Sequence, residues 1–363
     1  MREIQRWIDK YIFGFICAVL GIFSKLFFFA RCEKKYNKFL IIRLWAVGES
    51  ILTLPMAHAL KAKYPKSKIT VLCTKRNLDV FYKNTDIDEI MLLKNFIKII
   101  KSFRKFDIAV DTEPFLKISS ILGFWLAKRR IGFDYGVRAL LYTAKVRFND
   151  KQHEAFTFLD LSKEISAHYP LKKLIKLNYS KEDRAKVEKF LKENKIKEKE
   201  FLVGICPGAA ESSRFRMWPG ERFAALSDRL IEKFGAKIIF VGSKKEKELI
   251  GGIQGMMKNT SISATALSLR ELFCLIEKCR LFISNDTGPM HVAAAQGVKT
   301  IGLFGPNTPV RFAPFGKGNI AIRKYRRKPI INVHLGQVPK KSDIDFMGPI
   351  RVSDVINAVK KLK

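Results

Sequence analysis

Short apolar segments alternate with helical patterns along this chain, and the whole alternation occurs twice. Each apolar segment is continuous and does not alternate with polar residues, which is typical of parallel strands covered by helices on both faces. The pattern therefore predicts an α/β protein with two Rossmann-like domains. The clearest expected strands are Phe39–Leu44, Ile69–Cys73, Ile108–Asp111 and Arg130–Phe133, then Leu202–Cys206, Lys237–Val241, Leu281–Ser284 and Thr300–Phe304.

A highly charged stretch, residues 180–200, separates the two alternations and has few apolar positions. It is typical of a solvated helix and linker, and the length of 363 residues also suits two domains at about 150 residues each. We therefore expect five parts. They are a membrane-attachment segment at 1–37, an N-terminal domain at 38–180, a linker helix at 181–200, a C-terminal domain at 201–350 and a C-terminal helix at 351–363.

The N-terminal segment 11–30 is apolar except for Ser24 and Lys25, and basic residues flank it on both sides. About twenty apolar residues can cross a bilayer if Lys25 snorkels towards the basic end. Alternatively, a helix lying in the interface leaves Lys25 among the headgroups. The basic residues after the segment favour a cytoplasmic domain. We expect attachment to the cytoplasmic face of the inner membrane through residues 11–30 and leave the depth open.

The chain is strongly basic, with 68 Lys and Arg against 34 Asp and Glu and a formal net charge of +34. Such a charge implies a polyanionic neighbour, which can be nucleic acid, an anionic membrane or a phosphorylated substrate. No nucleic-acid-binding signature is present, so we expect no nucleic-acid partner. The six cysteines are scattered without a CxxC pair, which favours reduced thiols over a metal site or a disulfide framework.

The segment Phe282–Ala295, FISNDTGPMHVAAA, predicts a strand, a polar turn and a helix with Pro289 in its first turn. The expected helix start leaves the amides of Thr287, Gly288 and Met290 free, and such amides attract phosphate together with the helix dipole. His291 follows early in the same helix. The alternative is an ordinary helix start in which Asp286 serves only as the cap.

Two further loops follow expected strands of the second domain. The loop within Gly204–Pro219 carries Arg214 and Arg216, and the arginine fork suits phosphate oxygens, although solvated loop arginines are common. Gly302–Pro309 is a further Gly-Pro loop on the same side.

In the first domain, Glu49 follows the first strand. Its carboxylate can take a proton from an attacking hydroxyl, or it can simply favour the start of a helix.

Six blocks occur in order: RLxxxGE from Arg43, RRIGF from Arg129, HEAFTFLDL from His153, PGAxxxxRxRxWPxERFAxL from Pro207, NDTGPMHVAAA and GLFGP. This set resembles glycosyltransferase family 9, the lipopolysaccharide heptosyltransferases and their relatives. The resemblance implies a GT-B fold, with two Rossmann-like domains facing a cleft. It also implies transfer with inversion, without a metal or another cofactor, from a donor held by the C-terminal domain.

The resemblance also assigns residues. The family's catalytic Asp falls on Glu49, one methylene longer, and its phosphate-binding Lys falls on Arg216. Both are departures from the family pattern, whereas the block with Asp286, Thr287, Gly288 and His291 shows none. By the same comparison Glu246 contacts the donor ribose, and Arg129 and Arg130 belong to acceptor binding.

The expected activity is an inverting glycosyltransferase that moves a sugar, heptose by default, from an ADP-sugar to a lipopolysaccharide-core or related phosphorylated glycolipid. Growing charge on the leaving diphosphate is stabilised by the helix start and Arg216, while Glu49 acts as the base. Two alternatives remain, a glycolipid-binding relative with weak or no transfer, suggested by Glu49, and a basic nucleic-acid-binding protein.

Overall fold

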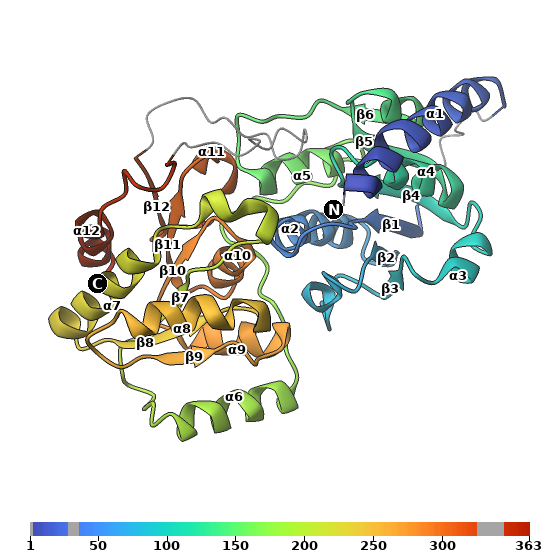
Figure 1. Cartoon of the computed structure of the whole chain (residues 1–363). Coiled ribbons are helices and arrows are strands. Elements are labelled where there is room, and N and C mark those ends of the chain that lie inside the picture. The colour runs from blue at the N-terminus through green and yellow to red at the C-terminus, as the bar shows by residue number, and fades with distance from the viewer. Residues whose placement is uncertain (1–2, 28–35, 325–344) are drawn as a thin grey trace. The chain divides into compact units, whose positions relative to one another are not determined.

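The computed structural model describes residues 3–27, 36–324 and 345–363. The chain divides into two compact units, the first ending at Leu171 and the second beginning at Lys172 (Figure 1). Each unit contains one parallel six-stranded sheet with helices packed on it. The two-domain α/β prediction is therefore confirmed.

The sheet of the first unit has the strand order β3-β2-β1-β4-β5-β6, and all its pairs are parallel. This is the doubly wound order, in which the chain reverses direction across the sheet between β1 and β4. Ligands of such sheets bind at the carboxyl ends of the strands next to that reversal. The strands are β1 (Lys38–Ile42), β2 (Lys68–Cys73), β3 (Glu89–Leu92), β4 (Phe106–Asp111), β5 (Ala127–Phe133) and β6 (Ala144–Val146).

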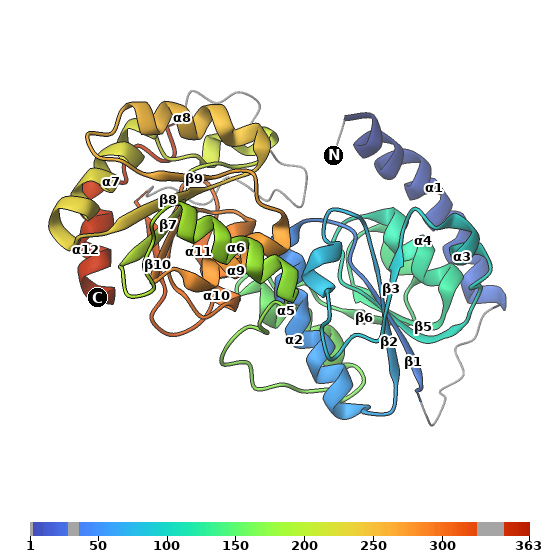
Figure 2. The same cartoon turned by 90° about the horizontal axis from the view of Figure 1, so that it is seen from below.

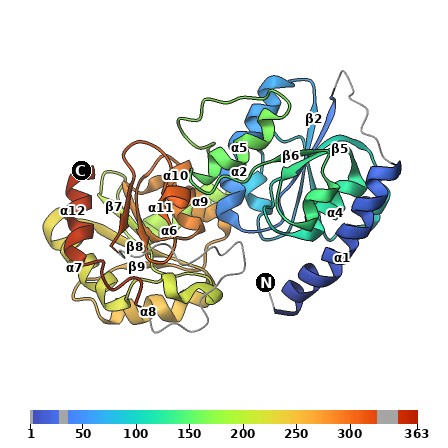
Figure 3. The same cartoon turned by 90° about the horizontal axis from the view of Figure 1, so that it is seen from above.

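Helices cover both faces of this sheet. On one face, Leu126 of α4 and Ile99 of α3 pack with Leu40 and Ile42 of β1 in one apolar cluster. Figure 3 shows α2 and α5 together on the other side of the sheet from α4. The helices of the unit are α1 (Glu3–Phe27), α2 (Val47–Lys63), α3 (Phe96–Ile100), α4 (Lys117–Leu126) and α5 (Glu154–Lys163), with short 3-10 turns η1 (Leu78–Phe81) and η2 (Val137–Leu141).

The N-terminal helix α1 packs on the outer side of α4 and η2. The Asp9 carboxylate accepts hydrogen bonds from the backbone N–H groups of Lys117 and Ile118, at 3.0 and 3.2 Å, and so caps α4 from another helix. Cys17 is fully buried against Phe124. The expected segment 11–30 thus begins within a helix that starts at Glu3, and residues 28–30 lie outside the described residues.

Across residues 3–27, 36–324 and 345–363, no helix combines the length and the apolar character needed to cross a membrane.

The second unit repeats the topology of the first. Its strand order is β12-β11-β10-β7-β8-β9, again all parallel, and the reversal lies between β7 and β10. The expected limits of Leu202–Cys206 and Lys237–Val241 match the observed strands. The strands are β7 (Leu202–Cys206), β8 (Lys237–Val241), β9 (Ile262–Ala264), β10 (Leu281–Asn285), β11 (Lys299–Phe304) and β12 (Ile320–Arg323).

The described helices of the second unit pack around this sheet (Figure 2). The C-terminal helix α12 joins α7 and the sheet in one core through Val355 and Val359. The expected linker helix is α6, which lies within the second unit and begins with a capping box at Ser180. The helices are α6 (Lys181–Glu193), α7 (Gly220–Phe234), α8 (Lys247–Gly255), α9 (Leu269–Lys278), α10 (Gly288–Ala295), α11 (Pro309–Phe312) and α12 (Val352–Leu362), with 3-10 turns η3 (Glu211–Arg216) and η4 (Lys244–Glu246).

The five cysteines that the structure describes are all buried and free, and their reduced state in solution stays a prediction. Cys32 lies outside the described residues. Burial raises the pKa of the Cys73 and Cys279 thiols to about 12, so both stay protonated at neutral pH.

Candidate functional site

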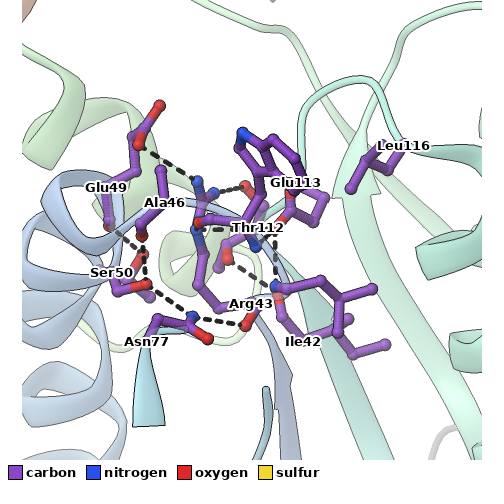
Figure 4. A network of polar contacts seen from close by, with 12 residues as sticks. Ile42, Arg43, Ala46, Glu49, Ser50, Asn77, Thr112, Glu113 and Leu116 are labelled. Carbon is purple, nitrogen blue, oxygen red and sulfur yellow. Dashed lines mark hydrogen bonds and ion pairs between the residues drawn. The ribbon is translucent and has the colours of Figure 1, made fainter. Parts of the chain in front are cut away.

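A buried polar network occupies the carboxyl ends of β1 and β4, at the chain reversal of the first sheet (Figure 4). Its centre is Arg43, the residue after β1, whose side chain is 2% exposed. Its guanidinium donates to the carbonyl oxygens of Thr112, at 2.9 Å, and Trp45, at 3.1 Å. It also lies 3.9 Å from a carboxylate oxygen of Glu49. Arg43 therefore connects both strand ends to Glu49.

The buried residue Glu113, which follows β4, holds the loop that leads to Glu49. One oxygen of its carboxylate accepts from the backbone N–H groups of Leu44 and Trp45, at 2.7 and 2.8 Å, and lies 3.7 Å from Arg43. Burial raises the pKa of the Glu113 carboxyl, and the positive charge of Arg43 opposes that shift. Its position between two strand ends indicates a structural role for Glu113 in the shape of the loop.

Glu49 lies in the first turn of α2, where an acidic side chain interacts favourably with the helix dipole. The helix follows Ala46, whose φ of 55° lies in the left-handed region that alanine rarely adopts. Two hydrogen bonds keep this turn in place, because Ser50 donates to the Ala46 carbonyl at 2.7 Å and Asn77 donates to the Ser50 hydroxyl at 2.8 Å. The Glu49 side chain keeps 17% of its surface exposed.

The second sheet has a matching polar network at its own reversal, between β7 and β10. Asn285, the last residue of β10, donates to the Pro207 carbonyl at 2.7 Å. Its side-chain oxygen accepts from the Trp218 backbone N–H at 3.1 Å. Trp218 is 1% exposed and anchors its indole N–H on the Ile350 carbonyl. One asparagine therefore ties down both ends of the loop that carries Arg216.

Arg216 and Asp286 are brought together as the sequence predicts. A guanidinium nitrogen of Arg216 lies 3.2 Å from the Asp286 carboxylate, which also accepts from the Asn307 amide at 2.7 Å. The Arg216 side chain is 15% exposed and Asp286 6%. The ion pair with Asp286 fixes the Arg216 guanidinium beside the start of α10. The other N–H groups of the guanidinium are thereby held in a constant position. Asn307, within the predicted Gly302–Pro309 loop, was not identified as a site residue from sequence.

The start of α10 differs in detail from the sequence prediction. Thr287, not Asp286, is the N-cap, and the Met290 N–H donates to the Thr287 carbonyl at 3.2 Å, so the expectation of a free Met290 amide is wrong. Within the described residues, the backbone N–H groups of Thr287 and Gly288 have no acceptor, and these two remain available to an anion. His291 is buried in the same turn.

Glu246 approaches the same edge of the sheet from η4. Its carboxylate accepts from the Ser243 N–H at 2.6 Å, completing a capping box, and presses against Gly208. A Cβ at Gly208 would lie 1.7 Å from a Glu246 oxygen, so only glycine permits this approach. Cys206, at the end of β7, lies between Glu246 and the Thr287 hydroxyl, and burial raises the pKa of its thiol to about 12.

Arg129 and Arg130 lie elsewhere, in the first half of β5. Arg130 is 2% exposed and donates to the Leu141 carbonyl at 2.6 Å, and burial lowers the pKa of its guanidinium to about 10. Arg129 donates to the Tyr36 hydroxyl at 2.7 Å. Arg130 therefore serves the packing of the sheet. An acceptor role for the pair stays a prediction that this geometry does not support.

Sequence reasoning missed Glu113, Asn77 and Asn285 as residues of the two networks. All three are polar residues close to the carboxyl end of an expected strand, either at its end or in the turn that follows. Polar residues in such positions indicate the ligand-binding edge of a parallel sheet. Within the described ranges, no cluster of His, Cys, Asp or Glu has the arrangement of a metal site.

The family model for "Glycosyltransferase family 9 (heptosyltransferase)" matches residues 96–341 of the chain, which is more than half of it. The chain belongs to glycosyltransferase family 9. The family resemblance inferred from the six blocks is therefore confirmed, and the protein is a glycosyltransferase. The donor-site and catalytic residues assigned from that resemblance stay predictions.

Relatives and solved structures agree with this family. A lipooligosaccharide heptosyltransferase 2 of Haemophilus ducreyi is 27% identical over 79% of this chain and 88% of its own length. The lipopolysaccharide core heptosyltransferase OpsX of Haemophilus influenzae is 25% identical over 89% and 96%. A family 9 structure from Veillonella parvula has a TM-score of 0.78 at 24% identity, covering 92% of this chain and 99% of its own. ADP-heptose heptosyltransferase II of Escherichia coli has a TM-score of 0.71 at 20% identity, over 90% and 98%.

Proposed function

We propose that this glycosyltransferase moves a heptose from an ADP-heptose donor to a lipopolysaccharide-core or closely related phosphorylated glycolipid acceptor, with inversion at the anomeric carbon. The observation that carries the proposal is the edge of the second sheet where Arg216 lies beside the available amides of Thr287 and Gly288. The names of the heptosyltransferase relatives support the sugar and the acceptor class.

The donor end of the proposed reaction follows from the charge that develops. As the bond between the anomeric carbon and the diphosphate oxygen breaks, negative charge grows on the leaving ADP. Amides at a helix start and a fixed guanidinium stabilise such charge without a metal. Asp286 and Asn307 hold Arg216 ready, and Glu246 beside Gly208 is assigned to the ribose hydroxyls.

Glu49 is assigned the acceptor end of the reaction. Its carboxylate takes the proton of the acceptor hydroxyl as that oxygen attacks the anomeric carbon. Arg43, 3.9 Å away, keeps the carboxylate oriented before the reaction.

A reaction with a purified heptose-deficient lipopolysaccharide core tests the proposal. ADP-, GDP- and UDP-sugars are first compared by thermal shift, since a bound donor stabilises the folded state. We expect stabilisation by the ADP-sugar, and an acceptor mass increased by one heptose in the presence of EDTA. Proton NMR of the product is expected to show the inverted anomer. Stabilisation by the ADP-sugar without any product would instead favour the glycolipid-binding alternative.

We also propose that α1 attaches the protein to the cytoplasmic face of the inner membrane within residues 11–30. Its outer face carries large exposed apolar side chains, among them Phe15 at 71% and Ile22 at 63%. Because Cys17 and Asp9 hold α1 on the first unit, the proposed attachment is that of a helix lying in the interface.

A further inference from the structure

The first unit carries a second exposed apolar cluster, formed by α3, the residues that follow it and the last turn of α4. We call it the α3 patch. Its side chains lie between 40% and 71% exposed, although all are large and apolar. Its members are Phe96, Ile97, Ile100, Phe103 and Trp125.

The α3 patch is held rigidly by the fold. Ile99, on the inner side of the helix, is 6% exposed and packs into the core beside Leu126. The ring of Phe103 lies 4.6 Å from that of Trp125, whose indole N–H donates to the Ile100 carbonyl at 3.4 Å. The outer apolar side chains are therefore presented by an anchored element and turn away from the core.

Positive charge surrounds the patch. Residues 94–106 include five Lys or Arg and no Asp or Glu. Lys98 pairs with Glu89 and Lys128 with Asp107, while Lys94, Lys101 and Lys105 have no carboxylate within ion-pair distance in the described ranges. Exposed lysines without a carboxylate partner therefore lie in the same segment as the apolar side chains. This combination complements a surface that is apolar inside and anionic outside, as an anionic bilayer is.

The patch also lies on the same face of the sheet as the proposed attachment helix. Ile99 of α3 and Leu126 of α4 belong to one cluster on that face, and α1 packs on α4 through Cys17 and Phe124. Figure 2 shows α1, α4 and α3 along one side of the first sheet. A bilayer meeting this side of the unit is therefore contacted at two separate places.

We propose that the α3 patch is a second membrane-docking site, which inserts its aromatic and aliphatic side chains into the headgroup region of an anionic bilayer. This inference rests on the proposed function, because a second docking site would orient the enzyme at the membrane surface that carries the proposed glycolipid acceptor. Two weak contacts on one rigid unit produce stable attachment where each alone is marginal.

Flotation of the full-length protein with vesicles tests the proposal. The vesicles are phosphatidylcholine with or without phosphatidylglycerol, and the variant is the double substitution Phe96→Ser with Ile97→Ser. The matched control is Met256→Ser with Val310→Ser, two exposed apolar residues of the second unit. We expect the α3 variant to lower partitioning to anionic vesicles at least about tenfold and the control to leave it unchanged.

Two further readouts make the result specific. Lys101→Gln with Lys105→Gln is expected to lower partitioning about fivefold per charge, and only for anionic vesicles. In a Trp7→Phe background, brominated lipid is expected to quench the tryptophan fluorescence of the protein. When Trp125→Phe is added to that background, the part of the quenching that comes from Trp125 is expected to disappear. Unchanged partitioning of the α3 variant, or an equal loss in the control, overturns the proposal.

Self-association is the competing occupant of the patch. If Phe96→Ser with Ile97→Ser instead abolishes a dimer seen by sedimentation velocity and leaves vesicle binding intact, a second copy covers the patch and the proposal is wrong. Transfer to a delipidated, soluble acceptor separates this inference from the proposed function. If the docking proposal is wrong, the enzyme still transfers sugar to the soluble acceptor. If the proposed function is wrong, no transfer to the soluble acceptor is seen although the protein still binds vesicles.

Discussion

Glu49 is the residue on which the proposed chemistry of the first unit depends. We expect Glu49→Gln to lower kcat by about 10²- to 10⁴-fold, the usual contribution of a general base, and to leave the donor Kd unchanged. Initial rates at saturating ADP-heptose and calorimetric donor titration check both parts. Glu232→Gln, at a glutamate of α7, is the matched control. Full turnover by the Glu49→Gln variant would remove Glu49 from the mechanism.

Arg216 is the corresponding residue of the second unit. Loss of a charged hydrogen bond costs about 1.5–3 kcal/mol, so Arg216→Ala is expected to weaken donor binding by about ten- to a hundredfold. Acceptor binding, titrated separately, is expected to stay the same. Arg216→Lys, which keeps the charge, recovers part of the affinity, and Arg229→Ala on the exposed side of α7 serves as control. Equal weakening of donor and acceptor would contradict the assignment.

Glu113 gives a pH-dependent prediction. Burial raises the pKa of its carboxyl in the folded state above 4.5, so the folded protein binds the proton more tightly than the unfolded chain. The stability associated with this proton is complete below pH 4.5 and declines as the pH rises towards the raised value. The difference in unfolding free energy between wild type and Glu113→Gln should therefore shrink over that range, by about 1.4 kcal/mol per pKa unit of the shift.

Urea unfolding of both proteins at a series of pH values measures that difference, and subtraction cancels the other carboxyl groups. A difference that does not change with pH would show that the pKa of Glu113 is not raised in the folded state, and one that grows as the pH rises would show that the pKa is lowered.

At the scale of elements, the loop after β7 and the start of η4 act together through Gly208 and Glu246. In Gly208→Ala the new Cβ displaces the end of the flexible Glu246 side chain, 1.7 Å away, and leaves the backbone in place. We expect stability to change by less than about 1 kcal/mol, while donor affinity falls as far as in Glu246→Ala. Gly251→Ala, where a Cβ meets no atom, is the control.

A double-mutant cycle decides between this effect and simple unfolding. Because both substitutions act through one carboxylate, the Gly208→Ala and Glu246→Ala losses in donor affinity should not add in the double variant. Full additivity would mean that Glu246 and Gly208 influence the donor site separately.

Sequence periodicity predicts the central elements well and the marginal ones poorly. The limits of β7 and β8 agree with the expectation because each strand has a strong, continuous apolar pattern. The sheet-edge strands β3 and β12 escape detection because they are short and only partly buried. The packing of α1 on α4 could not be predicted, since the partners of Asp9 and Cys17 lie over a hundred residues away.

The candidate site was predictable where one short segment carries the chemistry. Thr287 and Gly288 were found because strand, turn, proline and helix are contiguous. Glu113 was not, because its partners Leu44 and Trp45 are nearly seventy residues distant and only the pairing of β1 with β4 brings them together. The Met290 amide was misjudged because the first turn of α10 closes on the Thr287 carbonyl three residues earlier.

At the scale of the whole molecule, the two units use the same design. Each has a six-stranded parallel sheet in the same order, and in each a polar network lies where the chain reverses between its first and fourth strands. The first network orients a carboxylate, and the second holds a guanidinium beside open amides. The proposed function assigns acceptor activation to the first network and donor binding to the second.

The most direct test of the proposed donor site is a crystal structure of the protein with ADP-heptose bound. We expect diphosphate oxygens within hydrogen-bond distance of the Thr287 and Gly288 amides and of the Arg216 guanidinium, with the ribose at Glu246. A diphosphate bound at any other part of the second unit, with the start of α10 closed off by side chains, would contradict this donor site.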